Sequence, residues 1–577
     1  MSRKKLEELE EEYVEEIGVG EEGIKEEIKE VRKVEVKAGK VEKKIKAKAS
    51  PQEIYQTIKE ILSGRATTPI VLRDSGEGET ITTYNVGVAS VRIALKEGTG
   101  EGLYQVSEPE MTGEEELVYA YTLRKLIYEL KPEEAGKIAD VIIGKLQESI
   151  ELLGLEGRVN PHTIAYYLNR EVIGYGPIDV PVKDDRVEDI KCVGVGNNVI
   201  LMHREYGRLG WLTTNIRFEN EEFLADFVRR LAYKGGRGIS TAIPYVDAML
   251  PPPTPDFKSG MRFAGTIGSE ITRYGSSFVI RKFPRDPLSL SQIVGKNTLS
   301  PLMAAYLWFV AEQKRIFFAA GPTGSGKTTL LNAILGVLDP RLSYITIEDV
   351  YELQLPSWRW TAMTTRRSFT IIESKYEIKI EDLVAMAMRM RPDYLIVGEV
   401  RTPEQLIGLL FSSTTGHGAM TSIHAQDPDA LLVRLLTMKI EKSAIDLLWG
   451  CAITQPVNLP GLGISRRVVK ISEFTPGEEG VEIADVFAWV PETDTFIPTD
   501  LDELWSMSPR LQLLAKTLNI SKDKIIGDIA RRAEFIAKNK NTGFSILAEN
   551  AAREFYGVQT LHILKSSTKV AETGGKV

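Results

Sequence analysis

Residues 321–328, Gly-Pro-Thr-Gly-Ser-Gly-Lys-Thr, constrain the fold of this chain more than any other segment. The apolar run 316–320 precedes them, and a second apolar run, 329–335, follows. This order predicts a strand, a glycine-rich loop and a helix, with backbone N–H groups turned inward at a helix N-terminus that favours anions. The segment therefore predicts an α/β fold that binds a nucleoside triphosphate.

The side chains at the end of this loop have separate expected roles. Lys327 can reach the β- and γ-phosphate oxygens, and the Thr328 hydroxyl can bind Mg²⁺. We therefore expect ATP and Mg²⁺ as cofactors. The expected nucleotide-binding residues are Gly321, Pro322, Thr323, Gly324, Ser325, Gly326, Lys327, Thr328 and Thr329.

Composition and charge exclude several other classes of protein. With 72 basic and 80 acidic residues among 577, the net charge is −8, which does not favour nucleic acid as the main partner. Cys192 and Cys451 lie far apart and form no C-x-x-C pair, so neither a disulfide framework nor a zinc site is expected. No apolar stretch approaches the roughly 18 residues of a membrane span, and residues 1–8 turn acidic where a signal peptide would be apolar. We expect a cytoplasmic protein that meets a membrane only through partners.

The pattern along the chain divides it into six segments. Short β-like runs within 174–283 predict an α+β domain, with a hairpin from 189–195 and 199–202 and a helix over 221–234. Prolines at both ends of 284–287 predict a short stiff linker. The expected segments are a charged solvated helix or tail at 1–50, a mixed and helical region at 51–173, the α+β domain at 174–283, the linker at 284–287, the nucleotide-binding domain at 288–500 and a helical region with a tail at 501–577.

Two glutamates stand at the ends of predicted strands downstream of the loop. The β-branched run 344–347 ends at Glu348, and the apolar run 394–397 leads through Gly398 to Glu399. Because open α/β sheets bind ligands at the carboxyl ends of their strands, both carboxylates are expected beside the nucleotide. Either could orient or deprotonate the attacking water, and Glu399 could instead hold Mg²⁺ through water. Gly398 stands where many such strands carry a metal-binding Asp, and which glutamate is the base stays open.

Two of the five histidines flank another predicted strand, at positions 419–423. His417 follows a glycine before this strand, and His424 follows the strand's last residue. Either imidazole could sense the γ-phosphate or a neighbouring carboxylate. The alternative, a hydrogen-bonded structural histidine, applies to each of them.

The order of these motifs resembles the secretion (traffic) ATPase superfamily of type II and type IV secretion, type IV pili and archaeal surface filaments. The resemblance covers roughly residues 175–460, and its details are more similar to the archaeal or tight-adherence-like branch. It rests on the segments that match the family's Walker A, Asp box, Walker B and His box, at 321–329, 345–353, 388–401 and 415–425.

The resemblance implies a RecA-like P-loop ATPase core preceded by a smaller, PAS-like α+β domain that folds over the nucleotide, with extra helical regions at both ends. It also implies Arg262 and Arg281 as arginines that reach the γ-phosphate, beside Glu348, Glu399, His417 and His424 as catalytic residues and Thr328 with Glu399 at the metal. The implied assembly is a homohexamer that acts on an inner-membrane platform protein and powers secretion or filament assembly.

Two other functions stay open at this point. A RecA-like nucleic-acid translocase or helicase would need basic and aromatic side chains along a channel, and residues 358–360 and 366–367 form such a local cluster. A regulatory nucleotide-binding protein without turnover is disfavoured by the two glutamates that end strands.

Overall fold

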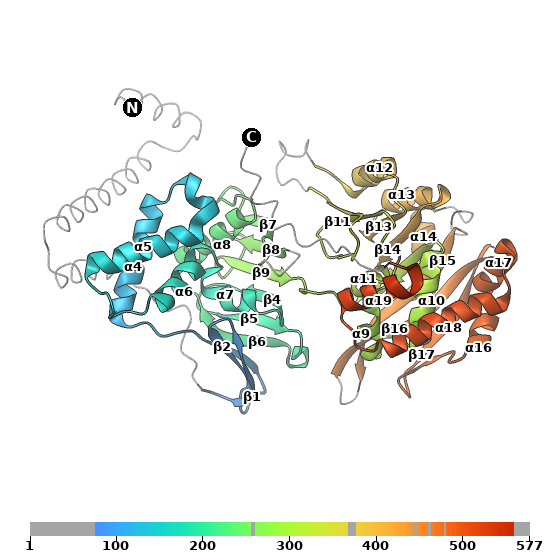
Figure 1. Cartoon of the computed structure of the whole chain (residues 1–577), viewed down its shortest axis with the longest axis horizontal. Helices are drawn as coiled ribbons and strands as arrows, with labels where there is room; N and C mark the ends of the chain where they lie inside the picture. The colour runs from blue at the N-terminus through green and yellow to red at the C-terminus, as the bar shows by residue number, and fades with distance from the viewer. Residues whose placement is uncertain are drawn as a thin grey trace, which may run out of the picture. The chain divides into compact units, whose positions relative to one another are not determined.

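The computed structural model describes residues 76–254, 260–366, 377–440, 444, 447–459, 463–477 and 480–558. It separates into a helical unit, residues 107–179, and a larger unit that holds two sheets (Figure 1). The charged segment expected at 1–50 lies outside the described residues.

The helical unit is built from α4 (Gly113–Glu129), α5 (Ile138–Leu153) and α6 (Pro161–Val172), with short 3₁₀ turns at Pro132–Lys137 and Gly176–Ile178. A capping box starts α4, because the Thr112 hydroxyl accepts from the N–H of Glu115 and the Glu115 carboxylate accepts from the N–H of Thr112. Leu117, Ile142 and Ile164 belong to its small apolar core. The helical pattern expected in this region is therefore present.

The first sheet of the larger unit is mixed, and its strand order is β1-β2-β3-β6-β5-β4-β9-β8-β7. The expected hairpin forms as β4 and β5, and the expected helix forms as α8 (Glu221–Lys234), which packs on the sheet through Phe227 and Phe278. The sheet begins before residue 174, because β3 pairs in parallel with β6. Its strands are β1 (Glu79–Val86), β2 (Ala89–Leu95), β3 (Gly102–Ser107), β4 (Val187–Cys192), β5 (Asn198–His203), β6 (Trp211–Arg217), β7 (Tyr245–Leu250), β8 (Met261–Thr266) and β9 (Ser277–Lys282).

The second sheet carries the phosphate loop and has the order β12-β11-β13-β14-β10-β15-β16-β17-β18. Its first six strands run parallel, and the remaining pairs are antiparallel. This doubly covered parallel sheet is the α/β architecture that the loop predicted. The strands are β10 (Ile316–Ala320), β11 (Tyr344–Glu348), β12 (Trp360–Thr364), β13 (Tyr394–Glu399), β14 (Gly418–Ile423), β15 (Leu448–Leu459), β16 (Gly463–Gly477), β17 (Gly480–Val490) and β18 (Thr495–Ile497).

Successive residues of each central strand enter opposite apolar cores, because side chains alternate across a strand. Phe317 joins the core beneath α10 (Pro301–Glu312) and α11 (Lys327–Leu335), whereas Phe318 joins the core beneath the helices on the other face. The helices on that second face are α12 (Ile380–Arg389), α13 (Pro403–Thr414) and α14 (Pro428–Thr437). Burial on both faces explains why these strands read as continuous apolar runs.

The helices after residue 500 share the core of the second sheet. Leu504, Ile529 and Phe535 lie in the same apolar cluster as Phe317, and the Phe535 ring lies 5.7 Å from that of Trp308 in α10. The expected C-terminal helices therefore form, but they complete the nucleotide-binding domain. They are α16 (Leu501–Met507), α17 (Pro509–Leu518), α18 (Lys522–Lys538) and α19 (Phe544–Tyr556).

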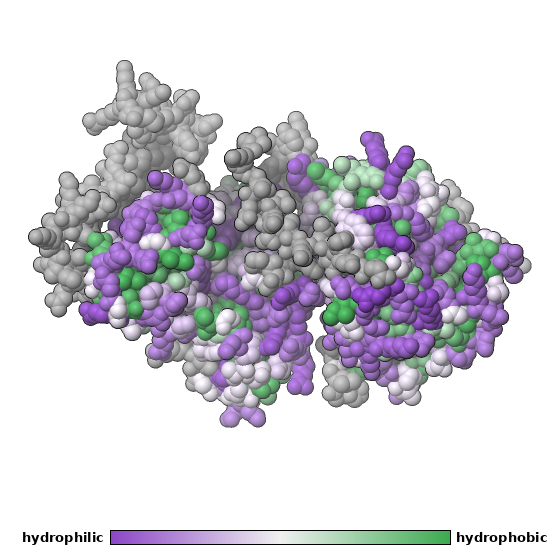
Figure 2. Space-filling view, viewed as in Figure 1, coloured by the Kyte–Doolittle hydropathy of each residue, from purple (hydrophilic) through white to green (hydrophobic). Residues whose placement is uncertain are grey.

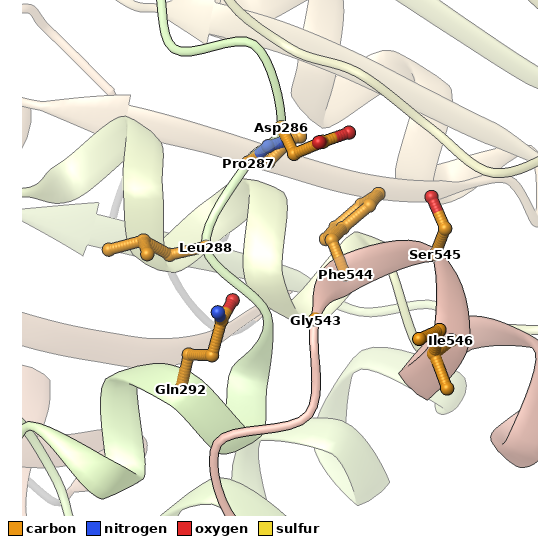
Figure 3. A pocket seen from close by; sticks show the side chains of 8 residues that line it. All are labelled: Asp286, Pro287, Leu288, Gln292, Gly543, Phe544, Ser545 and Ile546. Atoms are coloured by element: carbon orange, nitrogen blue, oxygen red, sulfur yellow. The ribbon is translucent and has the colours of Figure 1, made fainter. Parts of the chain in front are cut away.

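The segment that follows the expected linker contacts the loop before α19. The hydroxyls of Ser289 and Ser291, at the start of α9 (Leu290–Gly295), both donate to the carbonyl of Thr542. A pocket of about 280 Å³ lies beside this contact, and Figure 3 shows the linker side chains facing the first turn of α19 across it. Its lining residues are Asp286, Pro287, Leu288, Gln292, Gly543, Phe544, Ser545 and Ile546.

The face in Figure 2 is mostly hydrophilic, with apolar side chains scattered among polar ones. No helix within the described ranges is both long enough and apolar enough to cross a bilayer.

Candidate nucleotide site

The glycine-rich loop joins β10 to α11 as expected, and two of its glycines are required by the backbone. Gly326 has φ +99° and is the N-cap of α11, a conformation that costs other residues strain. At Gly321, an added Cβ would lie 2.2 Å from the carbonyl oxygen of Thr454 on β15. The loop is therefore folded tightly against the sheet at the start of α11.

Lys327 is held over this loop by main-chain oxygens. Its Nζ donates to the carbonyls of Gly321 at 3.1 Å and Pro322 at 2.9 Å, and lies 3.4 Å from Nδ1 of His424. Burial lowers the pKa of the Lys327 ammonium. The cation thus stands at the mouth of the loop, where the phosphates of a nucleotide are expected.

Glu399, at the end of β13, accepts hydrogen bonds on one carboxylate oxygen and lies close to an imidazole with the other. Oε1 lies 2.6 Å from Nε2 of His424, and Oε2 accepts from Arg401 at 2.6 Å and 3.0 Å. A further nitrogen of Arg401 donates to Asp349 at 2.8 Å. Arg401 therefore ties the ends of β11 and β13 together, a role that sequence reasoning missed although this residue lies inside the motif.

Glu348, at the end of β11, has a different environment from Glu399. It is 3% exposed, and its Oε1 accepts from the N–H groups of Glu352 at 3.1 Å and Leu353 at 3.0 Å. Its Oε2 is buried and has no hydrogen-bond partner among the described residues. Burial raises the pKa of Glu348 to about 8, which brings the titration of this carboxyl group close to neutral pH.

The glycine in place of the usual metal-binding Asp has a steric reason. A Cβ on Gly398 would lie 3.0 Å from Cγ of Glu348, closer than ordinary packing allows. Gly398 therefore makes room for the Glu348 side chain against β13.

Oxygen donors near Thr328 fit a magnesium ion only in part. Thr328 lies in the first turn of α11, burial raises the pKa of the Glu352 carboxyl group, and Glu399 lies at the end of β13. Over the described ranges, no three His, Cys, Asp or Glu side chains cluster closely enough to hold a metal by themselves. This donor set suits Mg²⁺, which keeps several waters and takes further oxygens from phosphates.

The two candidate histidines lie at opposite ends of β14. His424 follows the carboxyl end, beside Glu399, whereas His417 precedes the amino end, with its Nδ1 2.8 Å from the hydroxyl of Thr415. The six residues of β14 span about 20 Å. Within one subunit the sheet therefore brings His424, and not His417, to the phosphate loop.

The two candidate arginines are direct neighbours in the first sheet. Arg262 on β8 pairs with Arg281 on β9, so their side chains share one face. Arg262 donates to Asp247 at 3.0 Å and Arg281 donates to Asp189 at 2.9 Å, and Asp189 raises the pKa of Arg281. Each guanidinium is thus half-exposed and held by a carboxylate of its own sheet.

The aromatic and basic cluster at 358–360 and 366–367, considered above as a nucleic-acid contact, includes a residue of the second sheet. Trp360 lies on the edge strand β12, and its Nε1 donates to the hydroxyl of Thr346 at 2.9 Å. Residue 367 of this cluster lies outside the described residues. The described part supports a structural role for Trp360.

Comparison with known proteins places these motifs in a family context. A family model described as "Type II/IV secretion system protein" matches residues 268–459. Over 482 residues, 78% of this chain and 82% of the relative, the chain is 30% identical to an uncharacterized protein of Methanocaldococcus jannaschii. It is 30% identical over 233 residues, 39% of this chain and 63% of the relative, to a putative conjugal transfer protein of Mycobacterium tuberculosis. The X-ray structure of the Legionella pneumophila ATPase DotB is 17% identical with a TM-score of 0.36, over 63% of this chain and 88% of that one.

Proposed function

Because this chain belongs to the type II/IV secretion ATPase family, we propose that it is a motor ATPase that powers protein secretion or filament assembly. The observation that carries the proposal is the convergence of Lys327, Glu348, Glu399 and His424 at the carboxyl edge of one parallel sheet. That edge is where open α/β sheets bind their ligands.

The loop and Lys327 bind the phosphates in this proposal. The loop's N–H groups surround the β-phosphate, and Lys327 exchanges its carbonyl contacts at Gly321 and Pro322 for phosphate oxygens. Thr328 and Glu399 are the residues that would hold Mg²⁺, which supplies charge neutralisation at the β- and γ-phosphates. Glu352, four residues after Glu348, is a further oxygen donor for it in this proposal.

Glu348 is the better candidate for the base that accepts a proton from the attacking water. Its second oxygen has no partner among the described residues, and its pKa of about 8 lies near neutral pH, where a general base works best. Glu399, paired with Arg401 through Oε2 and 2.6 Å from the imidazole of His424 through Oε1, is better suited to positioning. The different environments thus support different roles for two chemically identical side chains.

Coupling to movement is assigned to the first sheet. Arg262 and Arg281 would exchange their carboxylate partners for the γ-phosphate, because a fixed guanidinium stabilises the charge that develops there. Binding and loss of the γ-phosphate would then close and open the first-sheet domain about the linker 284–287. In this proposal the chain works as a cytoplasmic homohexamer docked on an inner-membrane platform protein.

Phosphate release by the purified full-length protein tests this proposal. We expect Mg²⁺-dependent turnover that Lys327→Ala abolishes and that membrane fractions carrying the platform protein stimulate. A parallel assay adds single-stranded DNA in place of membranes. A nucleic-acid translocase with the same core would release phosphate faster with the DNA, and high salt would remove that stimulation. Wild-type release no faster than that of Lys327→Ala would refute the proposal.

A further inference from the structure

A third basic side chain, Arg466 at the start of β16, lies against the phosphate loop. Its Nε donates to the carbonyl oxygen of Gly324 at 2.9 Å, and its Cδ would lie 3.4 Å from a Cβ placed on Gly326. The neighbouring strand β15 is locked to the same loop, since the hydroxyls of Thr454 and Ser325 lie 2.8 Å apart. The hairpin of β15 and β16 thus forms one wall of the loop.

The position of Arg466 is fixed by its neighbour in the strand. Arg467 is 2% exposed, and two of its nitrogens donate to the two carboxylate oxygens of Asp494 at 2.7 Å each. Asp494 also accepts from Trp489 at 2.8 Å and from Asn297 at 2.9 Å, and Arg467 holds its pKa well below the usual range. Because successive side chains point to opposite faces of a strand, this buried clamp directs Arg466 to the opposite side.

Arg466 still has hydrogen-bond donors to offer. The Arg466 side chain is exposed. Among the residues that the structure describes, it makes one hydrogen bond, from Nε to the carbonyl of Gly324. A guanidinium has five N–H donors in a planar fork that matches phosphate oxygens. The contact with Gly324 therefore holds a charged fork beside a loop whose N–H groups bind phosphate.

The strand order indicates which phosphate this fork can reach. Glu399 and His424 end β13 and β14 on one side of β10, whereas Arg466 belongs to the β15–β16 side. Glu399 and His424, which are expected beside the attacked γ-phosphate, therefore lie across the loop from Arg466. The opposite end of the phosphate chain, with the α- and β-phosphates, falls to the side of β16.

We propose that Arg466 is a nucleotide-binding residue that contacts the α- or β-phosphate, the groups that ADP and ATP share. The proposal rests on the proposed function of this site. It assigns Arg466 to retention of nucleotide in both states of the cycle, in contrast to Arg262 and Arg281, which are assigned to the γ-phosphate alone.

The test measures the affinity of the full-length protein for ADP, a non-hydrolysable ATP analogue and inorganic pyrophosphate. We expect Arg466→Gln to weaken all three by about tenfold, the size of one charge-assisted hydrogen bond. Arg466→Lys, which keeps the charge and loses the fork, should fall between. Lys470→Gln is the matched control, because it removes one charge from the same strand, where Lys470 pairs with Asp485.

Affinities of Arg466→Gln within twofold of wild type would overturn the inference, and so would weakening of the ATP analogue alone. Weakening of ADP without pyrophosphate would show a base or ribose contact and would also overturn it. Thermal unfolding without ligand checks that each variant is folded. If Arg466→Gln unfolds at a lower temperature than wild type, the ligand affinities of Arg466→Lys and Lys470→Gln are compared instead, and weaker binding by Arg466→Lys alone supports the inference. Wild-type protein that binds ADP but releases no phosphate would sink the proposed function and leave this inference standing.

Discussion

The imidazole of His424 lies 2.6 Å from the carboxylate of Glu399, and its other ring nitrogen lies 3.4 Å from the ammonium of Lys327. One side chain thus connects the strand end on β13 with the phosphate loop. If Lys327 moves toward a phosphate, its contact with His424 changes, and the position of His424 beside Glu399 can change with it. We therefore expect this ring to couple nucleotide binding to the positioning of the Glu399 carboxylate.

Substitution of the two histidines should have unequal effects. We expect His424→Gln to lower kcat by about 10- to 100-fold, because a misplaced catalytic group costs about that much. His417→Gln is the matched control, since His417 lies at the opposite end of β14. Steady-state phosphate release decides, and an equal loss in both variants would contradict the separation of roles within one subunit.

Glu348 should control the pH dependence of turnover. With the pKa of Glu348 raised to about 8, kcat should rise with pH and level off above that value, as a base must lose its proton to act. Glu348→Gln should bind ATP and turn it over about 10²- to 10⁴-fold more slowly, without this pH profile. A flat wild-type profile between pH 6 and pH 9, measured at saturating ATP, would count against Glu348 as the base.

The same carboxyl group should affect stability. Its folded-state pKa lies above the unfolded value, so between about pH 4.5 and pH 8 the native state binds the extra proton and stability falls as pH rises. Glu348→Gln lacks this ionisation. Thermal unfolding should therefore show the wild type losing stability relative to Glu348→Gln across that window, and a constant difference would contradict the burial argument.

Gly398 should resist substitution even by alanine. A Cβ there meets Glu348 at 3.0 Å, so Gly398→Ala should cost about 1–3 kcal/mol of stability and lower kcat by displacing the carboxyl group. Gly527→Ala in α18 is the control, because a Cβ there meets nothing and a helical glycine costs about 1 kcal/mol relative to alanine. The opposite sign is therefore expected for the control in chemical denaturation.

The paired arginines of the first sheet should discriminate ATP from ADP. We expect Arg281→Gln to lower kcat by about 10³-fold or more while ADP affinity stays within twofold, because only the γ-phosphate distinguishes the two ligands. Arg229→Gln is the control, because Arg229 forms a surface ion pair with Asp226. Arg204→Gln would be a poor control, because Arg204 donates to the carbonyl of Lys282. Equal weakening of ADP and ATP by Arg281→Gln would remove this arginine from the γ-phosphate.

Lys282 provides a pH test that does not involve the nucleotide. It is 2% exposed, and burial lowers its pKa to about 7, so between about pH 7 and pH 10.5 the unfolded chain binds the extra proton. Stability relative to Lys282→Met should therefore rise with pH across that window. A difference in unfolding midpoint that does not change with pH would show that the ammonium is solvated.

Four central strands of the second sheet and the glycine-rich loop could be predicted from the residues alone, because these signals are local. A glycine-rich loop between a strand and a helix needs only its own residues, and strands buried on both faces are apolar whatever surrounds them. Glu348 and Glu399 could be placed at the ends of strands for the same reason, as charged residues that end apolar runs. The order of the motifs along the chain was sufficient to identify the family, because that order can be read without knowing any distance in the fold.

Tertiary structure decided the questions that depend on register and neighbours. The strand order separates His417 from His424 and puts β16 beside the loop, so Arg466 carried no signal in the sequence. The pairing of β3 with β6 and the shared core of α18 joined segments that the sequence had divided, because burial is decided by contacts between distant residues. The different roles that we propose for the two glutamates likewise rest on their surroundings, since desolvation and hydrogen bonding set a carboxyl group's pKa and its partners.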